Sequence, residues 1–343
     1  MIINLFSDTV TKPTLRMLQA MMAAEVGDDV FQQDPTVNKL ETKAASIFGK
    51  EAALFCPSGT MTNQIAINVH TERLDEIICD ESSHVYQYEA GGYSFNSGVA
   101  INLIKGINGK ITALQIQDAI KQPQDWLPRS RLVVIENTCN KGGGSYYTAA
   151  ELKPIHDLCK KNGLRLHLDG ARIFNALVET RDKPKAIGKL FDSISVCLSK
   201  GLGAPVGSLL IGDQDFIKMA RKVRKVMGGG MRQAGYLAAA GIYALDHHIE
   251  RLKIDNENAK KLGKTLESLG YIENVRPVQT NIVIFDVKPP FTSASFIELL
   301  KEHDILASPF GPQTVRFCTH LDIDDNMIKK TIEVLSHKIT NAV

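Results

Sequence analysis

Residues 131–136 read Arg-Leu-Val-Val-Ile-Glu, a short apolar run with no alternation of polar residues. Such a run is typical of a strand that is buried on both faces of a parallel sheet. Further strands are expected at residues 51–56, 76–80, 164–168, 193–198 and 206–211, and helices at about 60–70, 148–163, 213–226 and 231–269. This alternation predicts an α/β fold with a mostly parallel mixed sheet between helices.

Two helix starts carry recognisable capping signals. Asp34 precedes Pro35, so an N-cap residue is followed by proline at the first helical position. Thr148 and Glu151 are three residues apart, which is the spacing of a capping box. Both signals predict where a helix begins within the α/β region.

The sequence pattern changes after about residue 247. A charged helix is followed by expected strands at 281–286 and 313–318, with a helix near 293–303 between them and a closing helix. A chain of 343 residues is long enough for two domains of ordinary size. We therefore predict a large domain over residues 1–247, which includes the N-terminal segment, and a smaller α+β domain over residues 248–343.

Composition and charge argue against several classes of protein. The formal net charge is +2, and the basic run at 218–225 is read as the solvated face of a helix, so no nucleic-acid partner is expected. No apolar stretch reaches the roughly 18 residues of a membrane helix. The first residues lack a basic segment followed by an apolar run, so we expect no signal peptide and a cytoplasmic location.

The six cysteines are scattered along the chain, and none forms a C-x-x-C pair. This spacing argues against a zinc ribbon, a redox dithiol or a disulfide framework. We expect reduced thiols and no bound metal.

Three motifs follow expected strands. Pro57-Ser58-Gly59-Thr60 precedes a helix, where free backbone N–H groups suit a phosphate, although an ordinary capped turn explains the motif when it is taken alone. Asp169-Gly170-Ala171-Arg172 lies where open α/β sheets place their sites, unless Asp169 only caps the next helix and Arg172 lies on its surface. Lys200 stands directly after an apolar strand and before two glycines. A desolvated lysine at such a place can become a nucleophile, and the alternative is an ordinary lysine in a turn.

Taken together, the three motifs supply the parts of a pyridoxal-phosphate site. The cofactor needs a lysine for its Schiff base, an acid for its pyridine nitrogen and a site for its phosphate. The order along the chain is phosphate site, acid and lysine, with about 30 residues between the acid and the lysine.

Longer motifs over nearly the whole chain carry a family resemblance. The sequence resembles the threonine aldolase family of fold-type I pyridoxal-phosphate enzymes. The stretches that carry the resemblance are 5–11 (LFSDTVT), 27–30 (GDDV), 34–36 (DPT), 58–63 (SGTMTN), 89–92 (EAGG), 169–175 (DGARIFN), 199–207 (SKGLGAPVG), 228–235 (GGGMRQAG) and 316–322 (RFCTHLD).

The resemblance implies a set of cofactor contacts. Lys200 forms the Schiff base, and Asp169 pairs with the pyridine nitrogen and keeps it protonated. The phosphate is held by Ser58, Gly59 and Thr60, and His84 stacks on the cofactor ring.

The resemblance also implies how the substrate is held and how the chain assembles. The candidates for the substrate carboxylate are Arg172 and Arg316, because a guanidinium suits a carboxylate better than an ammonium does. Arg172 is also a candidate for contact with the cofactor. Ser7 adds a hydroxyl to the same carboxylate. Arg232 is expected to reach the site, in this chain or in a neighbouring subunit. Family members form homotetramers built from dimers, and their active sites lie at the dimer interface. The resemblance therefore implies that one residue of the run 218–225 approaches the cofactor phosphate of the neighbouring subunit across this interface.

One position departs from the family pattern. Cys139 stands where better-known members carry the histidine that is assigned to the substrate hydroxyl, and a thiol is a weak hydrogen-bonding group. Three interpretations stay open for Cys139: a reactive thiol, an inert space-filler, or a specificity element near the β-substituent, which we prefer. In that case His84, or a water held by Glu89, takes the proton of the β-hydroxyl.

The resemblance predicts cleavage of L-threonine or L-allo-threonine into glycine and acetaldehyde, and the same reaction on related β-hydroxy amino acids. A β-eliminating amino-acid lyase or a phenylserine-type aldolase on the same scaffold is the nearest alternative. A non-catalytic pyridoxal-phosphate protein is a second alternative, against which Lys200, Asp169, His84 and Arg316 argue.

Overall fold

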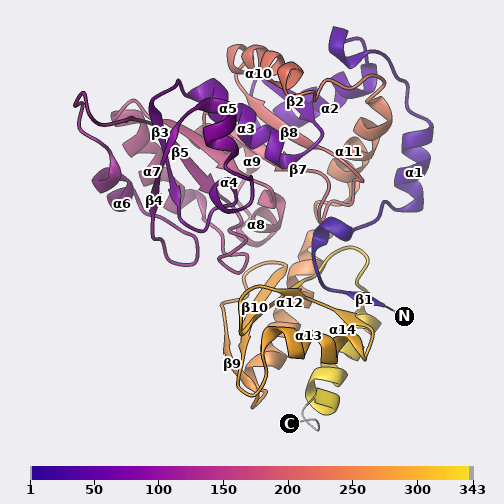
Figure 1. Cartoon of the computed structure of the whole chain (residues 1–343). Helices are drawn as coiled ribbons and strands as arrows, with labels where there is room; N and C mark the ends of the chain where they lie inside the picture. The colour runs from indigo at the N-terminus through magenta and orange to yellow at the C-terminus, as the bar shows by residue number, and fades with distance from the viewer. Residues whose placement is uncertain (1, 340–343) are drawn as a thin grey trace.

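A seven-stranded sheet forms the centre of the larger part of the molecule (Figure 1). The computed structural model describes residues 2–339. The strands lie in the order β2 (Ala52–Cys56), β8 (Ser208–Gly212), β7 (Ser193–Cys197), β6 (Arg165–Asp169), β5 (Arg129–Glu136), β3 (Asp75–Asp80) and β4 (Ala100–Ile104). Within the described chain, β8 alone runs against the other strands of this sheet. The expected mostly parallel mixed sheet is therefore confirmed.

Helices cover both faces of this sheet. The main core packs on one face, and its helices include α2 (Pro35–Phe48), α7 (Ala149–Lys161), α8 (Ile173–Thr180), α9 (Pro184–Leu190) and α11 (Gly235–His247). On the other face, two smaller cores hold α3 (Gly59–His70), α10 (Gln214–Val226) and the short helix α4 (His84–Gln87). We call the sheet with these helices the large region.

Both capping signals are confirmed. The Asp34 side chain accepts hydrogen bonds from the backbone N–H groups of Thr36 and Val37, at 3.1 and 3.0 Å. Thr148 and Glu151 form the reciprocal pair of a capping box at the start of α7. Both capping signals depend on residues close in sequence, which is why the local pattern predicts them.

The expected helix over 231–269 is wrong as a single range. The chain forms α11 up to His247 and then α12 (Leu252–Glu267), with a break at residues 248–251. Leu252 packs in the core of the large region, whereas Ala259 and Leu262 pack in a second core. The helix is therefore interrupted where the chain passes from one core to the other.

The second core belongs to what we call the small region. An antiparallel sheet has the strand order β12 (Ser308–Pro309), β13 (Thr314–Cys318), β10 (Ile282–Val287) and β9 (Ile272–Val275). It packs with the helices α12, α13 (Ser293–Lys301) and α14 (Asp325–Glu333) and with the π-helix η3 (Val334–Ile339). The strand β9 and the two-residue strands were not expected from the sequence.

The N-terminal segment starts in the small region. Its strand β1 (Ile3–Asn4) pairs in parallel with β11 (Ile305–Leu306), and Ile3 and Leu5 are buried in the second core. Figure 1 shows this indigo segment beside the orange and yellow C-terminal residues. The predicted boundary at 247/248 stays a prediction, but the first residues pack with the C-terminal part and lead from there to the site.

Candidate active site

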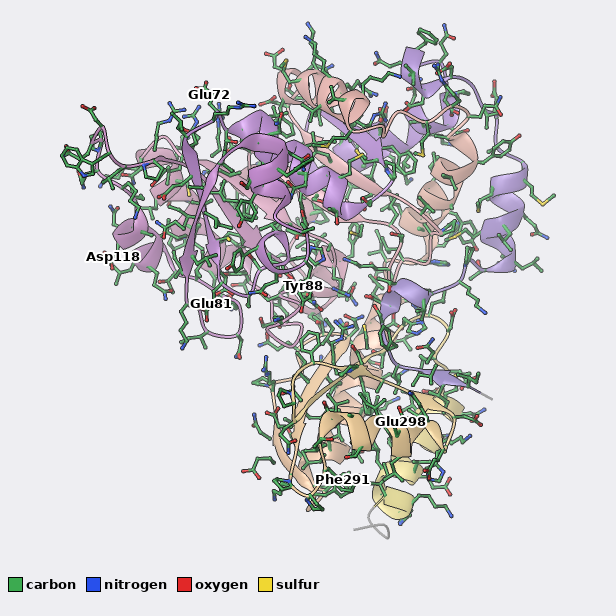
Figure 2. All side chains as sticks on the ribbon, viewed as in Figure 1. Glu72, Glu81, Tyr88, Asp118, Phe291 and Glu298 are labelled. Carbon is green, nitrogen blue, oxygen red and sulfur yellow. The ribbon has the colours of Figure 1, made fainter. Side chains whose placement is uncertain are left out.

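A cavity of about 400 Å³ lies where the N-terminal segment, the strand ends of the large region and the loop around β12 meet. It is lined by Ser7, Thr9, His84, Tyr88, Asn140, Arg172, Lys200, Ser308, Pro309, Phe310 and Arg316. Figure 2 shows Tyr88 at the side of the large region that faces the small region. Five of the predicted site residues therefore meet in one cavity, although they come from distant parts of the sequence.

The ends of β6 and β7 place the predicted acid and the predicted lysine close together. The two strands are parallel neighbours, so Asp169 at the end of β6 and Lys200, three residues after β7, lie at the same edge of the sheet. Asp169 is buried, and its Oδ2 accepts a hydrogen bond of 3.0 Å from Asn63 Nδ2. This geometry suits a carboxylate that is held ready for a cationic ring nitrogen.

His84 begins α4 and is fixed by Glu89. The distance from His84 Nδ1 to Glu89 Oε1 is 2.9 Å, and Glu89 also accepts hydrogen bonds from Asn63 and Gln64. Burial alone would lower the pKa of His84, but the Glu89 hydrogen bond and the Asp169 charge raise it overall. The water-holding role expected of Glu89 stays a prediction, whereas its hydrogen bond to Nδ1 orients the His84 ring.

The start of α3 has the geometry of a phosphate cradle. The Ser58 side chain caps the helix by accepting a hydrogen bond of 3.2 Å from Met61 N. A Cβ on Gly59 would lie 2.6 Å from Cys197 Sγ, so a side chain at this position would collide with β7. Gly59 and the exposed Thr60 present first-turn N–H groups, which have no acceptor inside their own helix. These residues therefore fit a phosphate group.

Arg316 is a buried cation that has no carboxylate partner among residues 2–339. Its Nη1 donates to Asn140 Oδ1 at 2.9 Å and its Nη2 to the Phe6 carbonyl at 3.0 Å, while within residues 2–339 its Nε has no hydrogen-bond partner. Burial lowers the pKa of Arg316, as expected for a charge without a compensating anion. An anionic ligand in the cavity would supply that compensation.

Arg172, the other candidate for the substrate carboxylate, already has a partner. Its Nε and Nη2 donate to the two oxygens of Asp8 at 2.6 and 2.8 Å, and both side chains are buried. Burial would raise the pKa of Asp8, but the charge and hydrogen bonds of Arg172 hold it well below its ordinary value. Because this bidentate pair occupies the guanidinium fork, Arg316 is better placed than Arg172 to bind a substrate carboxylate.

Arg232 lies outside the cavity in this chain. It pairs with Asp28, and its guanidinium lies 5.5 Å from the ring centre of Phe31. Its expected approach to a neighbouring subunit's site stays a prediction. Within the basic run, Arg221 pairs with Glu41 and Arg224 with Asp29, so the exposed cations of the run are Lys218, Lys222 and Lys225.

Cys139 is buried next to the cavity but does not line it. Its thiol donates to the carbonyl of Glu136 at 3.1 Å and contacts the carbonyl of Gly109 at 3.4 Å. Burial and the neighbouring Glu136 carboxylate raise the pKa of the thiol well above its ordinary value. This environment disfavours the thiolate that the reactive interpretation requires.

Sequence reasoning missed several residues of the site. Asp8 and Asn63 lie in stretches quoted for the family resemblance, Asn140 directly follows Cys139, and Tyr88 carried no signal. Glu136 was seen only as the end of a strand, yet it is buried beside Asp169. Burial and the Asp169 charge raise the pKa of Glu136 to about 7.

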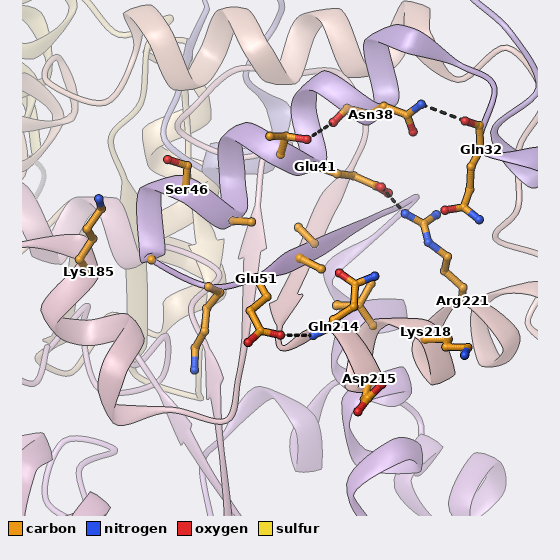
Figure 3. Close-up of a pocket in the computed structure, with 17 residues that line it drawn as sticks. Gln32, Asn38, Glu41, Ser46, Glu51, Lys185, Gln214, Asp215, Lys218 and Arg221 are labelled. Atoms are coloured by element: carbon orange, nitrogen blue, oxygen red, sulfur yellow. Dashed lines mark hydrogen bonds and ion pairs between the residues drawn. The ribbon is translucent and has the colours of Figure 1, made fainter.

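A larger cavity of about 1060 Å³ lies elsewhere, between α2, β2 and α10 (Figure 3). Two polar contacts join residues of its lining: Glu41 pairs with Arg221, and Glu51 Oε2 accepts a hydrogen bond from Gln214 N. It contains none of the predicted catalytic residues. The smaller cavity is therefore the candidate active site.

Three features lie at one edge of this sheet: an acid at a strand end, a lysine after the next strand and a phosphate cradle. Together they place the protein in the class of fold-type I enzymes. The family model described as beta-eliminating lyase matches residues 4–289. The low specificity L-threonine aldolase of Escherichia coli K12 is 42% identical over 98% of this chain and 98% of its own. The low-specificity L-threonine aldolase 1 of Arabidopsis thaliana is 40% identical over 96% of this chain and 94% of its own.

A solved structure agrees with this class. The threonine aldolase of Leishmania major superposes with a TM-score of 0.85 at 24% identity, covering 98% of this chain and 99% of its own, which confirms the fold. The chain belongs to the threonine aldolase family, within the group that the family model describes as β-eliminating lyases.

Proposed function

We propose that the protein is a carbon–carbon lyase that uses pyridoxal phosphate. It cleaves L-threonine and L-allo-threonine, and other β-hydroxy-α-amino acids, into glycine and an aldehyde such as acetaldehyde. The observation that carries the proposal is that Lys200 and Arg316 line one cavity. Lys200 suits attachment of a carbonyl cofactor, and the guanidinium of Arg316, whose Nε has no hydrogen-bond partner within residues 2–339, suits the carboxylate of an amino acid.

The residues present fit the cofactor. Lys200 would hold it covalently, Asp169 would pair with its ring nitrogen, His84 would lie against its ring, and the start of α3 with Ser58, Gly59 and Thr60 would bind its phosphate. When bound, the cofactor supplies the sink for the electron pair released as the Cα–Cβ bond breaks.

The other steps belong to the chain's own side chains. Arg316, with the Ser7 hydroxyl nearby, would fix the substrate carboxylate and so orient the bond that breaks. Glu89 occupies Nδ1 of His84, which leaves Nε2 to exchange a proton. His84, or an ordered water beside it, would take the proton of the β-hydroxyl.

We also propose a homotetramer built from dimers, with the active site at a subunit interface, and a cytoplasmic location. The support for this arrangement is that Lys218, Lys222 and Lys225 are exposed on α10, where a neighbouring subunit's phosphate could approach them. In the described residues we find no helix with the length and apolar character needed to span a membrane.

One assay separates this function from its nearest alternative. Incubation of the purified holoenzyme with L-threonine should release acetaldehyde and glycine in equal amounts. A β-eliminating lyase, favoured by the description of the matching family, would instead release ammonia and a keto acid, such as pyruvate from L-serine. A bound cofactor without turnover of any β-hydroxy amino acid would indicate a non-catalytic protein and refute the proposal.

Arg316→Lys tests the carboxylate contact. Lysine keeps the charge but loses the planar fork, so we expect KM for L-threonine to rise about 10- to 100-fold with a smaller change in kcat. Steady-state kinetics with Arg276→Lys as the control measure this, since Arg276 donates to the Lys141 carbonyl outside the cavity. Unchanged constants for Arg316→Lys would move the contact to another residue, with Arg172 next.

Replacements of Cys139 test its preferred role as a specificity element. A serine hydroxyl can donate to the Glu136 carbonyl as the thiol does, so Cys139→Ser should keep its activity. Histidine is larger and a stronger hydrogen-bonding group, so Cys139→His should alter the threonine to allo-threonine ratio of kcat/KM by at most about 1–3 kcal/mol. Loss of turnover in a folded serine variant would make the thiol catalytic, and an unchanged ratio would make it a space-filler.

A further inference from the structure

Glu136 takes no part in the steps assigned to Lys200, His84 and Arg316. Its carboxylate nevertheless binds two residues that line the cavity. It ends β5, where it is the register partner of Asp169 on β6, and it is buried. Its Oε2 accepts a hydrogen bond of 2.8 Å from the backbone N–H of His84, and its Oε1 accepts one of 2.8 Å from the backbone N–H of Asn140. One carboxylate thus holds two segments that are 56 positions apart in the sequence, and both His84 and Asn140 line the cavity.

Each of these two segments leads to a different function of the site. His84 faces the place expected for the cofactor, and its ring is oriented by Glu89. Asn140 accepts the hydrogen bond from Arg316 Nη1, so it fixes the guanidinium that is left without a carboxylate. The connection runs from His84 through Glu136 and Asn140 to Arg316, and it links the large region to β13 of the small region.

Burying a carboxylate at this position has an electrostatic cost, and the two hydrogen bonds that it accepts from the cavity wall offset that cost. Burying an acid beside Asp169 is unfavourable, and a neutral side chain could fill the same volume without that repulsion. The N–H groups of His84 and Asn140 bind different oxygens of Glu136. A carboxylate has two acceptor oxygens for them, whereas an amide side chain has only one.

We propose that Glu136 is a positioning residue that keeps the carboxylate anchor Arg316 in register with His84. This inference rests on the proposed function, because it assumes that Arg316 binds the carboxylate of an amino acid. Through Asn140, Glu136 sets where that carboxylate sits relative to the cofactor ring, and hence how well the amino acid binds.

Glu136→Gln is the first test, because glutamine offers one carbonyl oxygen and leaves one N–H group unpaired. We expect the dissociation constant of glycine, read from the absorbance of the holoenzyme, and KM for L-threonine to rise about tenfold, with a smaller fall in kcat. Asp80→Asn is the matched control: Asp80 ends the neighbouring strand β3, is buried, and accepts the N–H groups of Ser82 and Gly106 at 2.8 and 2.9 Å. It does not line the cavity, so its replacement should lower the melting temperature and leave glycine binding unchanged.

A double-mutant cycle with Asn140→Ala tests the route. If Glu136 acts through Asn140, the double variant should weaken glycine binding by much less than the product of the two single effects. Three results would overturn the proposal. They are single effects on the glycine dissociation constant that multiply in the double variant, unchanged glycine binding in Glu136→Gln, and an equal loss of glycine binding in Asp80→Asn. Wild-type protein that binds glycine without cleaving threonine would refute the proposed function, and the glycine cycle would still decide the role of Glu136.

Discussion

Lys200→Ala should abolish turnover and remove the visible absorption of the protein-bound cofactor. Lys200 lines the cavity three residues after β7, and no other lysine is among the residues that line it. Without the amine the cofactor has no covalent anchor, and the exchange of amines that starts each reaction cycle is lost. We expect a loss of at least about 10³-fold in kcat, which corresponds to about 4 kcal/mol.

The matched control for this prediction is Lys141→Ala. Lys141 lies close to the site, with its Nζ 5.4 Å from the ring centre of Tyr88, but it does not line the cavity. This variant should keep its visible absorption and most of its activity. Borohydride reduction of the wild type, followed by peptide mapping, should find the cofactor on Lys200, and a different labelled lysine would contradict the assignment.

Asp169→Asn should leave the fold intact and reduce kcat by several orders of magnitude. Asparagine has nearly the same shape and can keep the contact with Asn63, but it removes the negative charge that would keep the cofactor's ring nitrogen protonated. One pKa unit corresponds to about 1.4 kcal/mol, so a loss of two or three units lowers the rate by about 10²- to 10³-fold.

The measurement is kcat for L-threonine, together with the cofactor content and melting temperature of the variant. Asp192→Asn serves as the control, because Asp192 accepts the N–H of Leu166 at 2.8 Å but does not line the cavity. Turnover of Asp169→Asn at the wild-type level would show that the ring nitrogen is not controlled by this carboxylate.

Local patterns were sufficient for the parts of the fold that depend on neighbouring residues. The apolar runs located the strands that end at Asp169 and at Cys197, and the caps at Asp34 and Thr148 located two helix starts. Because parallel strands end at the same edge of a sheet, these runs also predicted that Asp169 and Lys200 lie together. The break between α11 and α12 was not predictable in this way, since apolar and helix-forming residues continue through it while the chain passes to another core.

The roles of the two arginines show where sequence patterns stop being sufficient. Both Arg172 and Arg316 were candidates for the substrate carboxylate, because a motif gives the residue type and not its partner. Folding places Asp8 against Arg172, across 164 positions of sequence, whereas in the described part of the chain the Nε of Arg316 has no hydrogen-bond partner. Likewise, the pattern places Cys139 after a strand, but packing decides that its thiol contacts the carbonyls of Glu136 and Gly109.

The amino-acid sequence was therefore enough to predict the α/β alternation of the large region, the family resemblance, and the residue types that a pyridoxal-phosphate site requires. Each of these depends on short-range periodicity, capping or a contiguous motif. Three other features depend on contacts between distant segments. They are the arginine that is left to bind a substrate carboxylate, the carboxylate that joins His84 to Asn140, and the cavity where the N-terminal segment meets β13. Such contacts form only when the two cores pack, because the partner of a buried charge is whichever group the fold brings within hydrogen-bonding distance.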